Sequence, residues 1–149
     1  MSKKGQAAME FLMTYGWAIL AAIVVIAVLA IYFRPGSLVQ NSVIVNAPLY
    51  GVGTVITSTQ IQVELKNNGA EDLTTTAASL DFNSPSTASC DPGAGFGAFT
   101  IGSAQILTFA NCVNLAVGET VNADISVSYT RPGSTLTQQS TGSVSGKAS

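Results

Sequence analysis

A single carboxylate stands at the edge of a long apolar segment, where its charge has few natural partners. Glu10 directly precedes Phe11–Phe33, a run of 23 residues without a charged side chain. An ionised carboxylate packed among apolar helices is costly unless a cation pairs with it. The alternative is that Glu10 only occupies a helix's first turn, where the macrodipole contributes about 0.3–1 kcal/mol.

Two cysteines are the other residues with evident chemistry. Cys90 and Cys112 are the only cysteines of the chain, and in a domain exported from the cell such a pair indicates one disulfide. Closing a loop of about 22 residues would contribute roughly 3 kcal/mol in the chain-entropy account. Two separate buried thiols are the alternative, while a metal site would need further soft ligands that the chain does not offer.

Composition excludes several classes of protein. The 149 residues contain no histidine, so histidine-based acid–base catalysis and histidine-ligated metals are excluded. No paired-carboxylate motif indicates a hydrolase, no short-spaced oxygen cluster indicates calcium, and we expect neither an enzyme nor a cofactor. After Gly36 there are three basic and seven acidic residues, which leaves no basic patch for nucleic acid.

The apolar run is long enough to span a membrane. As a helix it would extend about 35 Å, against about 30 Å for the hydrocarbon core of a bilayer. Pro35 ends it, and Pro35-Gly36-Ser37 is typical of a short hinge. Lys3 and Lys4 precede the run and favour a cytoplasmic N-terminus, which places the rest of the chain outside the cell. A plain membrane anchor and a secretory signal are the simpler alternatives.

The order Lys3-Lys4-Gly5-Gln6, then Glu10, then the apolar run resembles the class III signal of archaeal type IV pilins. In that family a prepilin peptidase cuts after the glycine, so the resemblance marks Lys4, Gly5 and Gln6 as the cleavage site. Glu10 then becomes the fifth residue of the mature chain, where the family carries its glutamate. The implied cut would also give Gln6 a free ammonium group, a candidate partner for Glu10 of a neighbouring copy. Ala8 stands two residues before Glu10, where the family commonly has a serine. The likeness covers about the first 33 residues and says little about the rest.

The resemblance also implies an assembly. It divides the chain into a leader (1–5), a hydrophobic assembly and transmembrane helix (6–34) and an extracellular head (37–149). The partners it implies are further copies of the chain, the prepilin peptidase, an assembly ATPase and a membrane platform protein. The precursor would lie in the cytoplasmic membrane, and the mature chain would form a surface filament used in adhesion.

Small residues in the apolar run favour close packing between helices. Thr14, Ala18 and Ala22 recur at intervals of four and form one small face, to which Gly16 adds a point of close approach and flexibility. A run that is hydrophobic all round suits a helix buried on every side, as in a bundle of identical helices. Alanine-rich filler in a lone membrane span is the alternative.

The segment after the hinge predicts an all-β, immunoglobulin-like sandwich, so that the whole chain is α+β. The clearest strands are Gln60–Lys66 and Val121–Thr130, in which polar and apolar residues alternate and Ile61, Val63 and Leu65 should face a core. The other expected strands are Ser42–Asn46, Thr54–Thr57, Thr74–Phe82, one or two within Phe99–Phe109, and Thr135–Val144 as an edge strand. We expect a turn or bulge at Leu49–Gly53, a loop at Cys90–Gly97 and a tail at Gly146–Ser149.

Two aromatic residues in a glycine-rich stretch suggest a contact surface. Phe96 and Phe99 lie in Gly93–Phe99, and an exposed loop there could bind a surface or a sugar. The alternative is that both side chains fold under the loop and complete the core.

Four functions remain open at this stage. The chain could be a major structural pilin, the subunit of the archaeal rotary filament (an archaellin), a minor pilin or adhesin, or a membrane-tethered binding domain or hydrolase that faces outward. Abundant filaments would favour the first two, and rotation would separate them.

Overall fold

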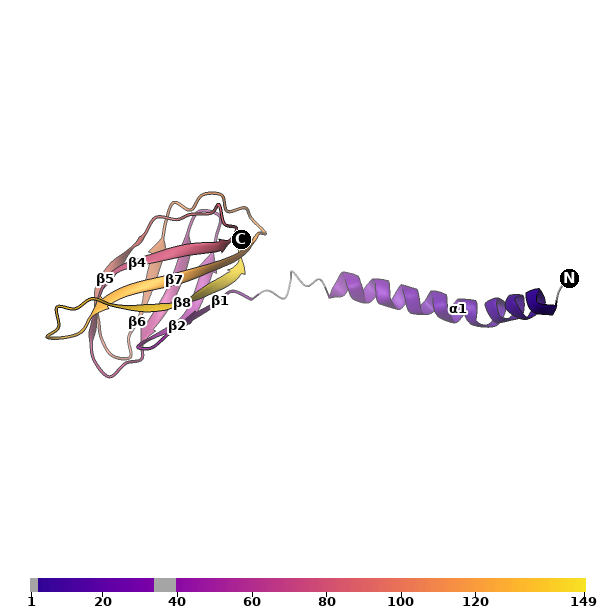
Figure 1. The fold of residues 1–149 in the computed structure, drawn as a ribbon, viewed down its shortest axis with the longest axis horizontal. Coiled ribbons are helices and arrows are strands. Elements are labelled where there is room, and N and C mark those ends of the chain that lie inside the picture. The colour runs from indigo at the N-terminus through magenta and orange to yellow at the C-terminus, as the bar shows by residue number, and fades with distance from the viewer. Residues whose placement is uncertain (1–2, 34–39) are drawn as a thin grey trace. The chain divides into compact units, whose positions relative to one another are not determined.

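The computed structural model describes residues 3–33 and 40–149, which belong to two separate compact units divided after Leu38. The first unit is one helix, and the second is a β-sandwich of eight strands (Figure 1). The predicted hinge and Arg34 lie outside the described residues.

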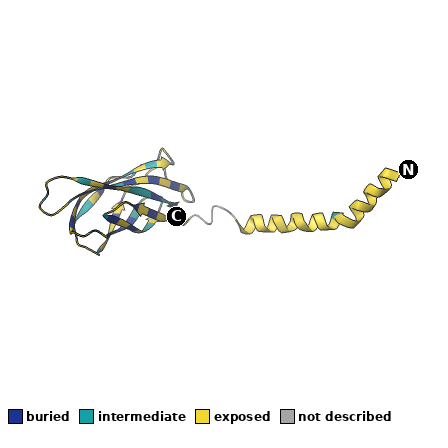
Figure 2. Cartoon of the chain, turned by 60° about the horizontal axis from the view of Figure 1, so that its bottom comes forward, coloured by how far each residue is buried: buried dark blue, intermediate teal, exposed yellow. Residues whose placement is uncertain are grey.

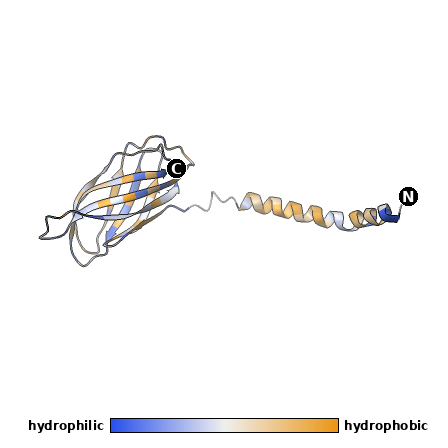
Figure 3. Ribbon diagram, in the orientation of Figure 1, coloured by the Kyte–Doolittle hydropathy of each residue, from blue (hydrophilic) through white to orange (hydrophobic). Residues whose placement is uncertain are grey.

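Helix α1 runs from Lys3 to Tyr32, so it begins before residue 6, the expected start. The 30 residues contain no proline, and apolar helix formers such as leucine and alanine fill most of the helix. None of its residues is buried, and Figure 2 shows the exposed colour along its length with a bend in the N-terminal part. Figure 3 shows the hydrophilic residues gathered at its N-terminal end.

The head consists of two antiparallel sheets. Its strands are β1 (Ser42–Val45), β2 (Leu49–Ile56), β3 (Ile61–Asn67), β4 (Leu73–Ser84), β5 (Gly93–Phe99), β6 (Ala104–Phe109), β7 (Thr120–Thr130) and β8 (Gln138–Lys147). The larger sheet has the order β1-β8-β7-β4-β5 and the smaller one the order β2-β3-β6. The α+β class is therefore confirmed, and the order fits an immunoglobulin-like sandwich in which β3 and β6 match strands B and E and β4, β7 and β8 match C, F and G.

The core lies between the two sheets. Ile61, Val63 and Leu65 on β3 are fully buried, as their alternation with polar residues predicted. From the opposite sheet β7 contributes Val121, Ala123, Ile125, Val127 and Tyr129, none of them more than 4% exposed. The two strands with the strictest period-two patterns thus form the centre of each inner face.

The expected edge strand at Thr135–Val144 was placed wrongly. The strand is β8, and it pairs with β1 on one side and β7 on the other, so it lies inside the larger sheet. Its inward positions hold Ser140, Val144 and Gly146 rather than a row of large apolar residues, which made the segment look like a solvated edge. The expected tail is also wrong, because Ala148 is buried and the Ser149 amide donates to the Ile56 carbonyl oxygen at 3.0 Å.

The segment predicted as a loop at Cys90–Gly97 is instead mostly strand. β5 begins at Gly93 and pairs with β4, and a register irregularity lies opposite it between Thr75 and Ala77. A side chain at Gly95 would collide with the backbone of Thr75, so glycine permits the close approach of the two strands. At Leu49–Gly53 the expected bulge is confirmed between Gly51 and Gly53, but the strand already begins at Leu49.

Candidate functional site

Helix α1 presents an apolar surface that nothing in its own unit covers. Its most apolar stretch of 18 residues has a mean hydropathy of 2.4, and it is the one helix in the described part of the chain that is long and apolar enough to cross a membrane. Phe11, Trp17 and Ile23 are 57%, 72% and 61% exposed. A surface of this size is stable only in lipid or against other protein surfaces.

Glu10 and the small residues lie on one row of this helix. Residues four apart follow one another along a helix surface, so Glu10, Thr14, Ala18 and Ala22 form a single i, i+4 ridge. The Thr14 hydroxyl donates a hydrogen bond of 2.9 Å to the backbone carbonyl oxygen of Glu10, within the same helix. That hydroxyl is therefore satisfied locally, and a neighbouring helix on this row would meet small side chains and one carboxylate.

The predicted cleavage residues lie in the first turns of α1. Lys4, Gly5 and Gln6 are helical and exposed, and no atom lies within 4 Å of the place where a side chain on Gly5 would begin. Gly16 is also helical and open on its free side. The described residues thus bring the cleavage segment and Glu10 onto one exposed helix end, and the aromatic rings of Phe11 and Tyr15 pack beyond it with centroids 4.9 Å apart.

The predicted disulfide is present. Cys90 and Cys112 are joined, with their Cα atoms 4.0 Å apart and a sequence separation of 22. Ser89 and Val113 flank it and exchange two backbone hydrogen bonds of 2.9 and 3.3 Å. The bridge therefore reinforces a short pairing between the connection before β5 and the connection before β7.

The proposed adhesive pair is not a surface site. Phe99 is fully buried, and Phe96 packs on it edge to face with ring centroids 4.9 Å apart. Phe96 itself is half-buried against the core. The stretch is a paired strand with Phe99 in the core and Phe96 packed against it, which agrees with the alternative interpretation that these rings complete the core.

A second apolar surface lies on the outer face of the small sheet. Tyr50, Val55 and Ile106 are 58%, 53% and 60% exposed there. Val55 and Ile106 flank the polar residues Gln62 and Glu64 of β3, and together they line a shallow hollow of about 240 Å³. This face is hard to recognise in the sequence, because Tyr50 and Val55 lie on β2 and Ile106 lies on β6, and only the pairing of both strands with β3 places them on one face.

Neither a scan against protein-family models nor a search of curated proteins finds a match to the chain. The described residues contain no group of three or more acidic, histidine or cysteine side chains placed to hold a metal ion. The features that bear on function are α1, the head surfaces and the N-terminal sequence.

Proposed function

We propose that this chain is the structural subunit of an archaeal type IV pilus. It is exported, cut after Gly5 and polymerised through α1 into a surface filament that serves in adhesion. The observation that carries the proposal is α1 itself: 30 residues, all uncovered, apolar along their length, with one carboxylate at the end that carries the signal-like sequence.

The physical reason for polymerisation is the surface that α1 leaves open. In the membrane, lipid covers it. Outside the membrane it must be covered by protein, and a bundle of identical helices covers every side at once. The ridge of Thr14, Ala18 and Ala22 allows the backbones of neighbouring helices to approach closely, as small residues do in membrane helix pairs.

Glu10 gives this packing its register. Cleavage after Gly5 creates an ammonium on Gln6, and a Glu10 carboxylate of a neighbouring copy is its natural partner. A buried charge without a partner costs several kilocalories per mole, about 3–5 kcal/mol when one partner of a pair is removed. Copies whose helices slide out of register would leave both charges unpaired, and the uncut precursor has no ammonium at this position.

The head supports the same proposal. A disulfide is typical of domains outside the cell, and the chain has one in its head. The exposed apolar residues Tyr50, Val55 and Ile106 offer a surface for contact between heads in the filament. The peptidase, the assembly ATPase and the platform protein enter the proposal through the resemblance alone.

Intact-mass analysis of filaments sheared from cells tests the proposal. We expect a chain that begins at Gln6 and retains the disulfide. A chain that begins at Met1 in isolated filaments would refute the cleavage, and a solitary uncut chain found only in the membrane fraction would support an anchored extracellular domain instead. Rotation of the filament would assign the subunit to the archaeal motility filament, and presence only at filament tips would make it a minor pilin.

A further inference from the structure

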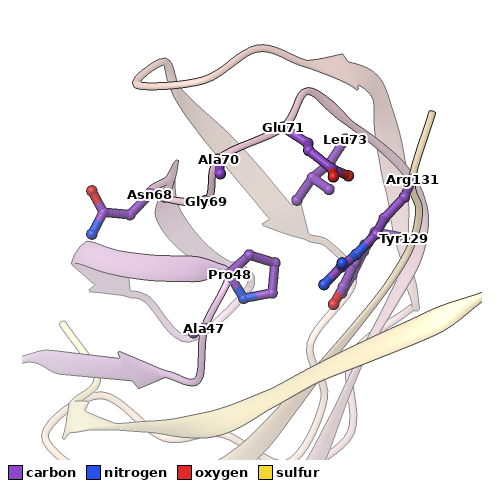
Figure 4. Close-up of a pocket in the computed structure, with 9 residues that line it drawn as sticks. All are labelled: Ala47, Pro48, Asn68, Gly69, Ala70, Glu71, Leu73, Tyr129 and Arg131. Atoms are coloured by element: carbon purple, nitrogen blue, oxygen red, sulfur yellow. The ribbon is translucent and has the colours of Figure 1, made fainter.

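A hollow at one end of the sandwich brings together opposite charges from separate segments. It has a volume of about 330 Å³, at the lower end of the range for small-molecule sites. Ala47 and Pro48 from the β1–β2 connection, residues 68–71 from the β3–β4 connection and Leu73 form part of its lining. Tyr129 and Arg131, at the end of β7, complete it. Figure 4 shows the side chains of Glu71 and Arg131 extending from these different segments toward the space beside Pro48.

The walls of this hollow are held by hydrogen bonds that do not involve its polar side chains. The Asn68 amide donates to the Pro48 carbonyl oxygen at 3.0 Å and so joins two of the connections. Buried Asn67 fixes the β3–β4 connection, because its side-chain nitrogen donates to the Glu71 carbonyl oxygen at 2.9 Å and its side-chain oxygen accepts from the Gly69 amide at 3.0 Å. The site is therefore largely formed before any ligand binds.

The Tyr129 hydroxyl is the feature that points to a ligand. Tyr129 is only 4% exposed, yet the structure gives its hydroxyl no hydrogen-bond partner among the described residues. Among the described residues, every fully buried side-chain nitrogen or oxygen has a hydrogen-bond partner. The Tyr129 hydroxyl has none, so it must be open to solvent. The hollow that Tyr129 lines provides that opening. Glu71 and Arg131 also form no ion pair with each other within the described residues, which leaves both groups available.

We propose that this hollow binds a neutral polyhydroxylated ligand, a monosaccharide unit of a surface glycan. The Arg131 guanidinium only donates hydrogen bonds and the Glu71 carboxylate only accepts them, whereas each sugar hydroxyl does both. Neighbouring hydroxyls can therefore bond to the two groups at once, with the Tyr129 hydroxyl as a third partner. Hydrogen bonds to charged groups are the stronger kind, and Pro48 in the lining offers apolar surface to the CH groups of the ring.

Charged ligands fit the hollow less well. An anion that is attracted by Arg131 is repelled by Glu71. A cation that is attracted by Glu71 is repelled by Arg131. The residues after Gly36 carry three basic and seven acidic side chains, so the head as a whole repels anions. A neutral ligand meets neither repulsion.

The inference deepens the proposed adhesive function by naming a class of partner for the head, and saturation-transfer NMR tests it. The full chain, kept in detergent, is mixed in turn with the methyl glycosides of glucose, galactose and mannose, and then with acetate and with glycine betaine. We expect saturation transfer to at least one glycoside, and at least fivefold weaker binding in both Arg131→Ala and Glu71→Ala. Tyr129→Phe removes only the hydroxyl and should weaken binding severalfold.

The matched controls are Lys66→Ala and Glu64→Ala. They remove one positive and one negative charge from β3, outside the hollow. Both should bind the glycoside as the unaltered chain does, and circular dichroism of every variant should show the same strand content. Absence of transfer to all three glycosides, unchanged binding in the two hollow variants, or stronger binding of acetate or betaine than of any sugar would overturn the inference. Filament formation is scored separately: filaments without sugar binding refute this site alone, and sugar binding by a chain that never assembles refutes the pilus alone.

Discussion

The side-chain amide of Asn67 donates a hydrogen bond of 2.8 Å to the backbone carbonyl oxygen of Phe99. The two residues end neighbouring segments of opposite sheets, 32 positions apart in sequence, and both are fully buried. The same amide nitrogen also donates to the Glu71 carbonyl oxygen. One buried side chain thus satisfies two backbone acceptors that water cannot reach freely.

Asn67→Ala should therefore destabilise the head. Without the amide, the carbonyl oxygens of Phe99 and Glu71 lose donors, and an unsatisfied buried group costs about 1–3 kcal/mol. Denaturant unfolding followed by circular dichroism would measure the loss. Asn68→Ala is the control, because Asn68 is exposed and makes no side-chain hydrogen bond within the described residues; its effect should stay within about 0.5 kcal/mol. Equal effects of the two variants would show that the buried hydrogen bonds contribute little.

A second prediction concerns the glycine that the sequence pattern assigned to a loop. Gly95→Ala should cost about 1–3 kcal/mol, because the new methyl group would collide with the Thr75 backbone and push β5 from β4. Gly53→Ala is the matched control: Gly53 also lies beside a strand irregularity, but no atom lies within 4 Å of its added methyl group. Thermal unfolding of both variants decides the matter, and similar midpoints would remove the close approach as the reason for glycine at position 95.

Gly95 also shows why part of the fold could not be predicted from the sequence. The helix, β3 and β7 were predictable, because a continuous apolar run and strict alternation each allow one arrangement. The start of β5 was not, because Gly93 and Gly95 stand where a strand pattern normally shows large apolar residues. A strand was expected near β8 but as an edge, because Ser140 and Gly146 occupy two of its buried positions. Glycine indicates a turn in the sequence, and only the neighbouring strand shows that it serves close approach instead.

The site residues divide in the same way. The disulfide could be predicted from the sequence, because the chain has only two thiols. The proposed cleavage segment and the proposed role of Glu10 also come from the sequence, because they depend on local order. The hollow beside Tyr129 could not, since Glu71 and Arg131 lie 60 positions apart and only the sandwich brings their segments together. Phe99 was proposed for the surface because its exposure depends on the pairing of β5, which the sequence did not reveal.

The disulfide gives a third prediction. Replacing both Cys90 and Cys112 by alanine should lower the free energy of unfolding by about 3 kcal/mol, because a closed loop of this length restricts the unfolded chain by about that amount. Denaturant unfolding measures it, and the unaltered protein treated with reductant should move to the same midpoint. If reduction leaves the midpoint unchanged, the bridge contributes nothing to the stability of the head.

The final prediction concerns Glu10 and separates cleavage from assembly. Glu10→Gln keeps the size and helix propensity of the side chain but removes its charge, so the ammonium on Gln6 of a neighbouring copy would lose its partner. Because an unpaired buried charge costs about 3–5 kcal/mol, we expect cleavage after Gly5 to continue while the yield of filaments falls at least tenfold. Intact mass of the membrane fraction measures cleavage, and electron microscopy of sheared material measures filaments. Asp81→Asn removes a charge from an exposed position of β4, away from the outer face of the small sheet, and should leave both unchanged. A Glu10→Gln chain that forms filaments at the normal yield would show that the carboxylate serves only the first turn of the helix, where the macrodipole favours it by about 0.3–1 kcal/mol.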